Sequence, residues 1–392
     1  MRAEIPHLTP AQWQSDIRLL ADAVPKTHKN AFHHTSKAEF GREVARLLKL
    51  AEHGSDPAIV VGIQRLVASL GDGHSGLSTM GLFRSYPLEL MYLDGEIRVI
   101  RAGAGFEKAI GARVLAIDGT PIAEAQRRVL PLISQAENQW WIRDQQPRKL
   151  VVAENLFATG IAHDVDGANF TLQRDGGRPI DLVIPSVPAG TSIDWREITP
   201  LPLSRTHTDQ SFWFTDLPGT KAVYVNFRNY SDLAENARAL FDHVDAVGAK
   251  ALVFDLRFNG GGNFTLPRRF IIPEIRRRAT LMAPGHLYVL VGRHTFSAAM
   301  TNAIDFKRDL KATLVGEPIG ARPNGYQENG MITLPQSNLR VSVSTLYYQF
   351  WPTNIAALKP DVSRPPNWGA VRSGRDSALT YAIAQLRQNG RR

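Results

Sequence analysis

The chain of 392 residues contains no cysteine, so disulfide bonds, thiolate zinc sites and a cysteine nucleophile are excluded together. Long apolar runs are missing too: no stretch approaches the roughly 18 consecutive apolar residues of a membrane span. The first residues, MRAEIPH, have no apolar centre of the kind that a signal peptide needs. We therefore expect a cytoplasmic protein or, if a leader has been removed, a periplasmic or extracellular one.

Internal repeats and low-complexity linkers are also absent, and 43% hydrophobic with 21% charged residues is typical of a globular protein. A chain of this length can form about two or three domains. The formal net charge is +9, but the basic residues are scattered, with short clusters such as those at 268–269 and 276–278. We expect these charges to be solvated, and we predict no nucleic-acid partner and no membrane insertion.

The N-terminal segment has the periodicity of helices. Thr9 and Gln12 have the spacing of a capping box, and a proline stands between them at the first helical position. The apolar stripe that follows ends at Pro25, and two more helices are expected at Lys37–Glu52 and Pro57–Leu70. The stripe consists of Trp13, Ile17, Leu20 and Val24.

Short strands are expected between Tyr86 and Ile184. Leu88–Tyr92 and Ile97–Ile100 are separated by an Asp-Gly pair, which predicts a hairpin. The stretch Gln135–Gly167 interrupts this pattern with aromatic and polar residues. It is either a plain insertion or a segment that lines or covers the substrate, in which case Trp140 and Trp141 are candidate substrate-binding residues.

From Pro200 onward, strands and helices alternate. Strand Ala222–Phe227, a helix capped by Ser231 and stopped by Gly248, and strand Ala251–Leu256 make a βαβ unit. Parallel pairing with a right-handed crossover is expected for such a unit. Open α/β sheets bind ligands at the carboxyl ends of their strands, so the residues that follow the strands are the first place to look for a site.

One serine stands where a buried strand gives way to a helix. The sequence VGRHTFSAAM follows an apolar strand at Leu287–Val291 and contains Ser297 directly before a helical pattern. The N–H groups at a helix start can hold an oxyanion, which makes Ser297 a candidate nucleophile. A serine at this position is also a common helix N-cap, and the segment alone leaves both interpretations open.

Two further segments contain candidate functional residues. In KALVFDLRFNGGGN a buried strand runs into three glycines, which form either a tight turn or an anion-binding loop with bare amides. Asp255 and Arg257 precede the glycines and are expected to anchor the loop as a pair. In LGDGHS a histidine, His74, follows an apolar helix at a glycine-flanked turn, although a single loop histidine is more often solvated or structural.

Together, LGDGHSGL, VFDLRFNGGGN and VGRHTFSAAM, in that order, resemble the C-terminal-processing (tail-specific) serine peptidases. Their relatives include the tricorn core protease and the interphotoreceptor retinoid-binding repeats. Two weaker matches follow at fitting places, VGEPIGARPNGYQE and LKPDV. The resemblance extends from about Trp13 to about Leu379, which is nearly the whole chain.

The resemblance implies an α/β fold with a crotonase-like (ClpP-like) catalytic core, an inserted PDZ-like β-rich domain and an N-terminal helical segment. We assign residues 1–82 to the helical segment, 83–198 to the PDZ-like domain with its insertion, and 199–392 to the core. The sequence GARVLAIDGTPI resembles the strand-turn centre of PDZ-like modules. The helix after it, at about Ile122–Ser134, would then flank a peptide groove.

The resemblance also implies roles. Ser297 becomes the nucleophile, and the amide of Ala298 with that of Gly261, or of its neighbour Gly262, becomes the oxyanion hole. Processing proteases pair the serine with a lysine, but the corresponding place here holds Arg322, and an arginine is not deprotonated in proteins. Arg322 is kept as a possible substrate-binding residue.

The tricorn branch uses a histidine from the first motif, which corresponds to His74, and a neutral imidazole is available near pH 7. A Ser–His rather than a Ser–Lys pair is therefore expected. His294, three residues before the serine, is a second candidate base, although we expect it to point elsewhere. Ser75, next to His74, is a possible substrate-binding residue.

The acid that would orient the imidazole is not defined by the sequence. The tricorn-type glutamate lies shortly before the last motif, where this chain has Thr353 and Asn354. Glu317 and Glu328 are the nearest carboxylates to an active-site loop and are candidate catalytic residues. Each is equally well interpreted as a surface charge or a strand-end partner.

The sequence thus favours a serine-type peptidase that acts on peptide or protein substrates through an acyl-enzyme. Two alternatives stay open: a non-catalytic ligand-binding relative of the retinoid-binding repeats, and a hydrolase of non-peptide esters or amides. No cofactor and no metal are expected, because the histidines at 28, 33 and 34 have no carboxylates at ligand spacing. Peptide specificity and oligomeric state are left open.

Overall fold

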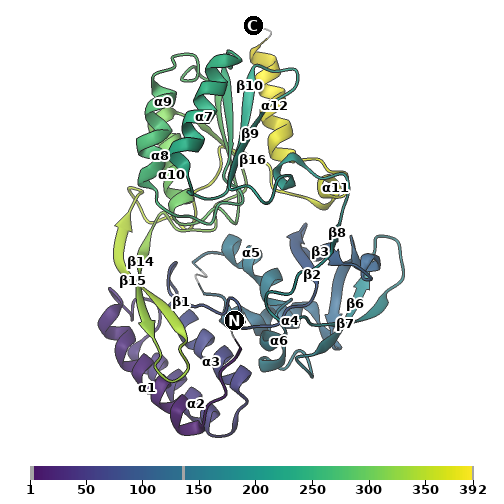
Figure 1. Ribbon diagram of the computed structural model, residues 1–392, viewed down its shortest axis with the longest axis vertical. Helices are drawn as coiled ribbons and strands as arrows, with labels where there is room; N and C mark the ends of the chain where they lie inside the picture. The colour runs from purple at the N-terminus through teal and green to yellow at the C-terminus, as the bar shows by residue number, and fades with distance from the viewer. Residues whose placement is uncertain (1–3, 135–136, 391–392) are drawn as a thin grey trace. The chain divides into compact units, whose positions relative to one another are not determined.

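The computed structural model describes residues 4–134 and 137–390 (Figure 1). The chain divides into two compact units: unit 1 contains Met1–Ile198 and Gly325–Tyr348, and unit 2 contains Thr199–Asn324 and Gln349–Arg392. The chain therefore passes from one unit to the other three times. The protein is a mixed α/β molecule with three sheets among its described residues.

Unit 1 begins with the three expected helices, α1 (Pro10–Thr27), α2 (Lys37–His53) and α3 (Asp56–Ala68). The capping box of Thr9 and Gln12 is present. The expected end of α1 at Pro25 is wrong, because the helix continues to Thr27. A proline so close to the C-terminus removes only one helical hydrogen bond, and burial of the apolar stripe outweighs that loss.

These helices pack on a small antiparallel sheet. Its order is β1 (Gly76–Leu77), β15 (Arg340–Gln349) and β14 (Asn324–Thr333). The shared core includes Trp13, Leu20 and Ile63 from the helices and Val341 and Val343 from β15. The β14–β15 hairpin thus joins the N-terminal helices, although about 250 residues separate them along the chain.

The second part of unit 1 is an antiparallel sheet with the order β2-β3-β4-β6-β7, to which β5 and β8 add at β4 and β3. The strands are β2 (Leu88–Leu93), β3 (Glu96–Gly103), β4 (Arg113–Ile117), β5 (Thr120–Pro121), β6 (Gly167–Gln173), β7 (Ile180–Pro185) and β8 (Trp195–Glu197). The predicted hairpin is confirmed, with Asp94 at φ 49° and Gly95 at φ 89°, the two positive φ values of a type I′ turn.

Helix α4 (Ile122–Val129) follows β5, and the interrupting stretch folds into α5 (Gln139–Lys149) and α6 (Ala153–Ala158). Gln135, the first residue of that stretch, lies outside the described residues. Leu150, Ala153 and Leu156 are buried in the core of the β-rich part. The stretch is therefore integrated into the core of unit 1.

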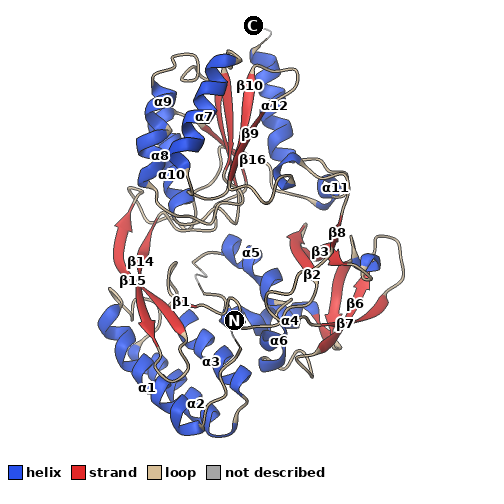
Figure 2. Cartoon of the chain, in the orientation of Figure 1, coloured by secondary structure: helices blue, strands red, loops and turns tan. Residues whose placement is uncertain are grey.

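Unit 2 contains a sheet with the order β16-β13-β12-β11-β10-β9, parallel except for β9. Its strands are β9 (Phe212–Asp216), β10 (Ala222–Phe227), β11 (Ala251–Asp255), β12 (Leu287–Val291), β13 (Thr313–Gly316) and β16 (Val362–Ser363). Helices cover both faces: α7 (Leu233–Ala246), α8 (Thr265–Phe270), α9 (Ile272–Arg276) and α10 (Ala298–Leu310) on one, and α12 (Ser377–Asn389) on the other (Figure 2). The short α11 (Trp368–Val371) precedes α12.

The βαβ prediction for unit 2 is confirmed, since β10 pairs with β11 in parallel around α7. The expected cap is wrong: Asp232, at φ 51°, precedes the helix, and no side chain caps it. The predicted cap, Ser231, thus stands one residue before the actual N-cap position of α7. Gly248 follows the end of α7 at φ 60°, as expected of a helix-ending glycine. Because β11 and β12 are parallel neighbours, the glycine loop and the Ser297 loop emerge at the same edge of the sheet.

Candidate active site

The backbone at Ser297 is strained. Ser297 precedes α10 with φ 49° and ψ −124°, a combination that glycine adopts easily and that other residues rarely occupy. Such a conformation costs on the order of 1–3 kcal/mol and is found most often at functional sites. The Ser297 side chain makes no capping hydrogen bond with the helix. Capping therefore does not explain this serine, and the nucleophile interpretation remains.

The loop that carries Ser297 is fastened to the end of β11. The Thr295 hydroxyl donates to the Leu256 carbonyl at 2.8 Å and accepts from the Gly292 amide at 3.0 Å. The Phe296 amide donates to the Asn259 carbonyl at 3.0 Å. These bonds join the Ser297 loop to the segment that leads into the glycines. The two loops are therefore connected directly by hydrogen bonds.

The glycine loop leaves no room for side chains. A Cβ on Gly261, at φ 113°, would lie 2.6 Å from the Ser297 Cβ and 3.2 Å from the Ala298 nitrogen. A Cβ on Gly262, at φ 156°, would lie 2.4 Å from the ring of Tyr230. Bare backbone at Gly261 is thus required for its approach to the serine, as the anion-binding interpretation of the glycines predicts.

Asn259 organises this loop. Its side-chain amide donates to the Phe227 carbonyl at 3.0 Å, and its side-chain oxygen accepts from the Gly261 amide at 2.9 Å. The Gly261 N–H is therefore already hydrogen-bonded within the loop. To donate to an oxyanion, it would have to break its hydrogen bond with Asn259. Sequence reasoning missed Asn259, although an asparagine directly before three glycines is a recognisable turn signal.

Buried ion pairs support both loops. Arg257 donates to Asp255 and Asp376, with its terminal nitrogen 2.5 Å and 2.6 Å from their oxygens, and this fastens the start of the loop to α12. The predicted Asp255–Arg257 anchor is confirmed. Glu317, at the end of β13, accepts from the Arg293 guanidinium at 2.7 Å and 2.9 Å. Glu317 is thus a strand-end partner that holds the loop before Ser297.

The two other basic candidates, His294 and Arg322, belong to unit 2. The Nε2 atom of His294 lies 3.7 Å from the place that a Cβ on Gly260 would occupy. His294 lies in the loop between β12 and α10, before the helix begins, and the expectation that it points away from Ser297 stays a prediction. Arg322 is exposed on the segment between β13 and β14.

His74 lies in unit 1, half-buried in the loop between α3 and β1. Burial lowers the pKa of the His74 imidazole, and a hydrogen bond with the Tyr326 main chain and the charges of Asp72 and Glu328 oppose that change. The net direction is downward. A lowered pKa keeps the imidazole neutral at physiological pH, which is the form a general base needs.

The other candidates of unit 1 have structural partners. The buried Ser75 hydroxyl accepts from the Ser344 amide at 3.2 Å and hydrogen-bonds Asp72. Glu328 is exposed on β14 and accepts from the Tyr348 hydroxyl at 3.1 Å.

Of the two tryptophans, Trp141 is 5% exposed, with its ring nitrogen donating to the Ser134 carbonyl at 3.2 Å. Trp140 is half-buried and therefore the more accessible candidate for substrate contact.

Glu137 is a buried carboxylate that the sequence analysis did not single out. Glu137, just before α5, is 9% exposed. A Cβ on Gly73 would lie 2.6 Å from its Oε1 atom, and one on Gly325 would lie 3.4 Å from the same atom. Glu137 therefore packs against the residue before His74 and against the start of β14. Nothing in its sequence neighbourhood indicated this, because the contact joins three distant segments.

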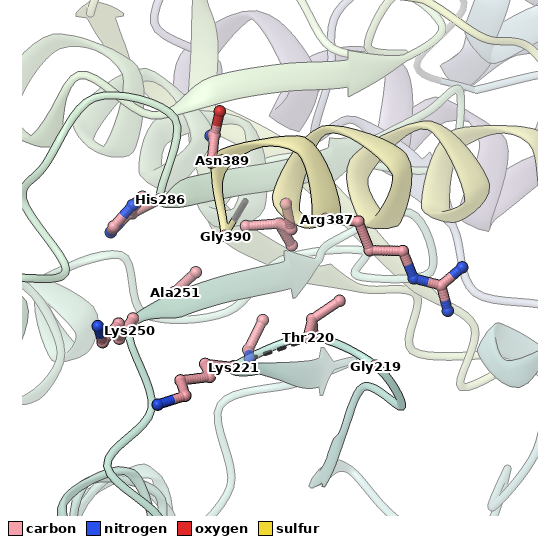
Figure 3. A pocket seen from close by; sticks show the side chains of 11 residues that line it. Gly219, Thr220, Lys221, Lys250, Ala251, His286, Arg387, Asn389 and Gly390 are labelled. Carbon is pink, nitrogen blue, oxygen red and sulfur yellow. Dashed lines mark hydrogen bonds between the residues drawn. The ribbon is translucent and has the colours of Figure 1, made fainter. Parts of the chain in front are cut away.

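A cavity of about 770 Å³ also lies in unit 2, at the starts of β10, β11 and β12 and the end of α12 (Figure 3). Lys221, Lys250 and His286 lie on one side of it, whereas Arg387 points the other way and donates to the Pro218 carbonyl at 3.0 Å. It is at the opposite ends of the strands from Ser297, so we do not assign the proposed catalysis to it.

Within residues 4–134 and 137–390, no cluster of histidine and carboxylate side chains could hold a metal ion. No helix in the same ranges is long and apolar enough to cross a membrane.

Comparison with known proteins gives matches only among solved structures, since no family model and no curated protein sequence matches the chain. A serine-to-alanine mutant of CPAF superposes with a TM-score of 0.66 at 11% identity, covering 96% of this chain and 97% of that chain. Mature CPAF complexed with lactacystin gives 0.64 at 11% identity, covering 97% and 98%. The photosystem II D1 C-terminal processing protease gives 0.45 at 17% identity, covering 93% and 98%.

The protein therefore has the fold of CPAF over nearly its whole length. The resemblance inferred from the motifs is confirmed at the level of the fold by the structural similarity to CPAF. At these identities the similarity establishes the fold, and the activity has to be argued from the site.

Proposed function

We propose that the protein is a serine peptidase that hydrolyses peptide bonds in peptide or protein substrates through an acyl-enzyme. The observation that carries the proposal is the strained Ser297 backbone at the start of α10, with Gly261 packed directly against it. We also propose that unit 2 is crotonase-like and that the β-rich part of unit 1 is PDZ-like. The presence of proteases among the structures that share the fold supports the proposed peptidase function.

In the proposed reaction, the Ser297 hydroxyl attacks the substrate carbonyl while the neutral His74 imidazole accepts its proton. The Ala298 amide, with a glycine-loop amide from Gly261 or Gly262, stabilises the negative oxygen of the intermediate. The imidazolium returns the proton to the leaving amine, and water then releases the acyl group by the reverse sequence. The proposal requires the His74 ring to reach the Ser297 hydroxyl.

His74 is the proposed base because the alternatives are poorer. Arg322 is excluded as the base, because an arginine side chain does not act as a proton acceptor in proteins. His294 lies beside Gly260 in the same unit as Ser297, so it is the base to compare with His74. The lowered pKa of His74 favours the neutral ring that proton acceptance needs.

A fluorophosphonate probe tests the nucleophile directly. We expect covalent labelling of the wild type and none of Ser297→Ala. His74→Ala should abolish labelling, because the hydroxyl is weakly nucleophilic without a base. Arg322→Ala should remain labelled and serves as the control for a change of charge in unit 2. The measurement is gel fluorescence with mass spectrometry of the labelled peptide.

The outcomes separate the alternatives. If His74→Ala is labelled and His294→Ala is not, the base is His294. An unlabelled but folded wild type would contradict catalysis and favour the ligand-binding alternative. If the protein is labelled, profiling with a peptide library follows, and a flat profile together with ester turnover would favour the non-peptide hydrolase.

A further inference from the structure

Three basic residues stand in a row at one edge of the sheet of unit 2. Lys221, Lys250 and His286 are the residues directly before β10, β11 and β12, which are parallel neighbours. The first residues of these strands are within one residue of register, and neighbouring strands lie about 4.8 Å apart. The row lines the cavity at the starts of these strands, and the three side chains lie on the same side of it (Figure 3).

The two lysines carry positive charges that the protein does not neutralise. Both are exposed, and no carboxylate among the described residues forms an ion pair with either of them. The described residues that line the cavity include no aspartate and no glutamate. By contrast, Arg257, Arg268 and Arg278 of the same unit pair with carboxylates. Because lysine side chains are charged at neutral pH, Lys221 and Lys250 are available to an anionic ligand.

The ring of His286 is fixed by one hydrogen bond. Its Nδ1 atom lies 2.7 Å from the Thr280 carbonyl oxygen, which can only accept, so Nδ1 carries a proton. The other ring nitrogen, Nε2, remains for a ligand, and it donates to an anion when the ring is protonated. The two lysines therefore supply most of the attraction, and His286 adds to it in its protonated form.

The last turn of α12 forms another wall of the cavity. Arg387 donates to the Pro218 carbonyl at 3.0 Å, and the Asn389 side-chain amide donates to the Gly285 carbonyl at 3.2 Å. These bonds fasten the helix end to the segments before β10 and β12, so the wall is held in place. The C-terminus of a helix carries about half a negative charge, which opposes an anion, but the two lysine charges exceed it.

We propose that this cavity binds a small ligand with two or more phosphate groups. Its volume of about 770 Å³ lies within the range of about 300–1,000 Å³ that is usual for small-molecule sites. Lysine binds phosphate as a point charge, and a cavity bordered by one sign of charge concentrates an anion. Lys221 and Lys250 precede adjacent strands, so one ligand with two phosphates can contact both. The site is at the opposite ends of the strands from Ser297 and is separate from the proposed peptidase function.

Isothermal titration calorimetry with inorganic triphosphate, at physiological ionic strength, tests the site. We expect the wild type to bind triphosphate at a single site. Lys221→Gln and Lys250→Gln should each bind about tenfold more weakly, as is typical when one hydrogen bond from a charged group is removed. Lys49→Gln, an exposed change on α2 of unit 1, is the matched control for net charge and should bind as the wild type does. Inorganic phosphate cannot contact both lysines at once and should bind at least about tenfold more weakly than triphosphate.

A second measurement does not depend on the heat of binding. A ligand that binds only the folded protein raises the midpoint of thermal unfolding. Triphosphate should raise this midpoint equally in the wild type and in Ser297→Ala, and it should have no effect on the double variant Lys221→Gln/Lys250→Gln. Because both lysines are exposed, the double variant without ligand should unfold near the wild-type temperature.

Several results would overturn the proposal. Equal affinity for triphosphate in the wild type and the double variant would place the binding elsewhere on the protein. A tenfold loss in Lys49→Gln would show that only net charge matters. A wild type that binds no triphosphate, or binds phosphate as tightly as triphosphate, would exclude the proposed ligand. Fluorophosphonate labelling bears only on the peptidase proposal, so the two proposals can fail independently.

Discussion

At the scale of single residues, the conformation of Ser297 and the need for glycine at position 261 are linked by close packing. Ser297 has a backbone conformation that glycine adopts more easily than other residues. Gly261 lies so close to Ser297 that a side chain at position 261 would clash with it. The strain at Ser297 persists because Thr295 and Phe296 are held to Leu256 and Asn259 by hydrogen bonds. The site therefore stores free energy that a stability measurement can detect.

We expect Ser297→Gly to be more stable than Ser297→Ala by about 1 kcal/mol. Both changes remove the hydroxyl, but only glycine relieves strain of about 1–3 kcal/mol, and its greater freedom in the unfolded chain returns about 0.4–1 kcal/mol of that gain. The measurement is urea unfolding followed by fluorescence. An alanine variant as stable as the glycine variant would contradict a strained backbone at Ser297.

At the scale of elements, the loop before β1 depends on one carboxylate. Asp72 connects the end of α1, the His74 loop and β15, which are distant in sequence. Its pKa of about 2 lies below the usual value near 3.9 of an unfolded aspartate. A depressed pKa in the folded state means that the charged form stabilises the fold.

This contribution has a defined pH dependence. It should be about 2–3 kcal/mol above about pH 5, should fall to about half near pH 3, and should be lost as the pH drops through the folded pKa. The difference in unfolding free energy between the wild type and Asp72→Asn should shrink over the same range. Urea unfolding between pH 7 and pH 3 measures it, and Asp209→Asn, an exposed change, is the control. A difference that is independent of pH would show that Asp72 acts through packing alone.

At the scale of the whole molecule, two units have separate cores. Val99 is buried in the β-rich core of unit 1, and Val253 is buried in the core under α12 in unit 2. Ser297 belongs to unit 2 and His74 to unit 1. Proteins with more than one core often unfold in more than one step.

We therefore expect local effects of core truncation. Val253→Ala should cost about 2 kcal/mol and speed hydrogen exchange in β10–β13, with β3, β4 and β6 unchanged. Val99→Ala should have the converse effect. Hydrogen exchange with mass spectrometry measures both variants. Equal acceleration across the two units would show that they unfold as one.

The elements were predictable where one local pattern dominates. The strands at 222–227 and 287–291 were predicted with the bounds that the structure has, because continuous apolar runs have one good arrangement in a covered parallel sheet. The errors at Pro25 and Ser231 are displacements of one or two residues, where burial and loop geometry outweigh local preference. His294 lies in the six-residue segment 292–297 between β12 and α10, so the helix geometry on which its prediction rested does not apply to it.

What the sequence determined by itself is the candidate nucleophile, the glycine loop and the order of strands and helices, because each depends on neighbours along the chain. The tertiary structure decided which groups surround them: the Gly261 amide bonded to Asn259, Glu317 paired with Arg293, and Asp72 bonded to the Ser344 hydroxyl. Those partners lie from two to about 270 residues away and are chosen by burial and hydrogen-bond satisfaction in the folded chain, which no local pattern encodes.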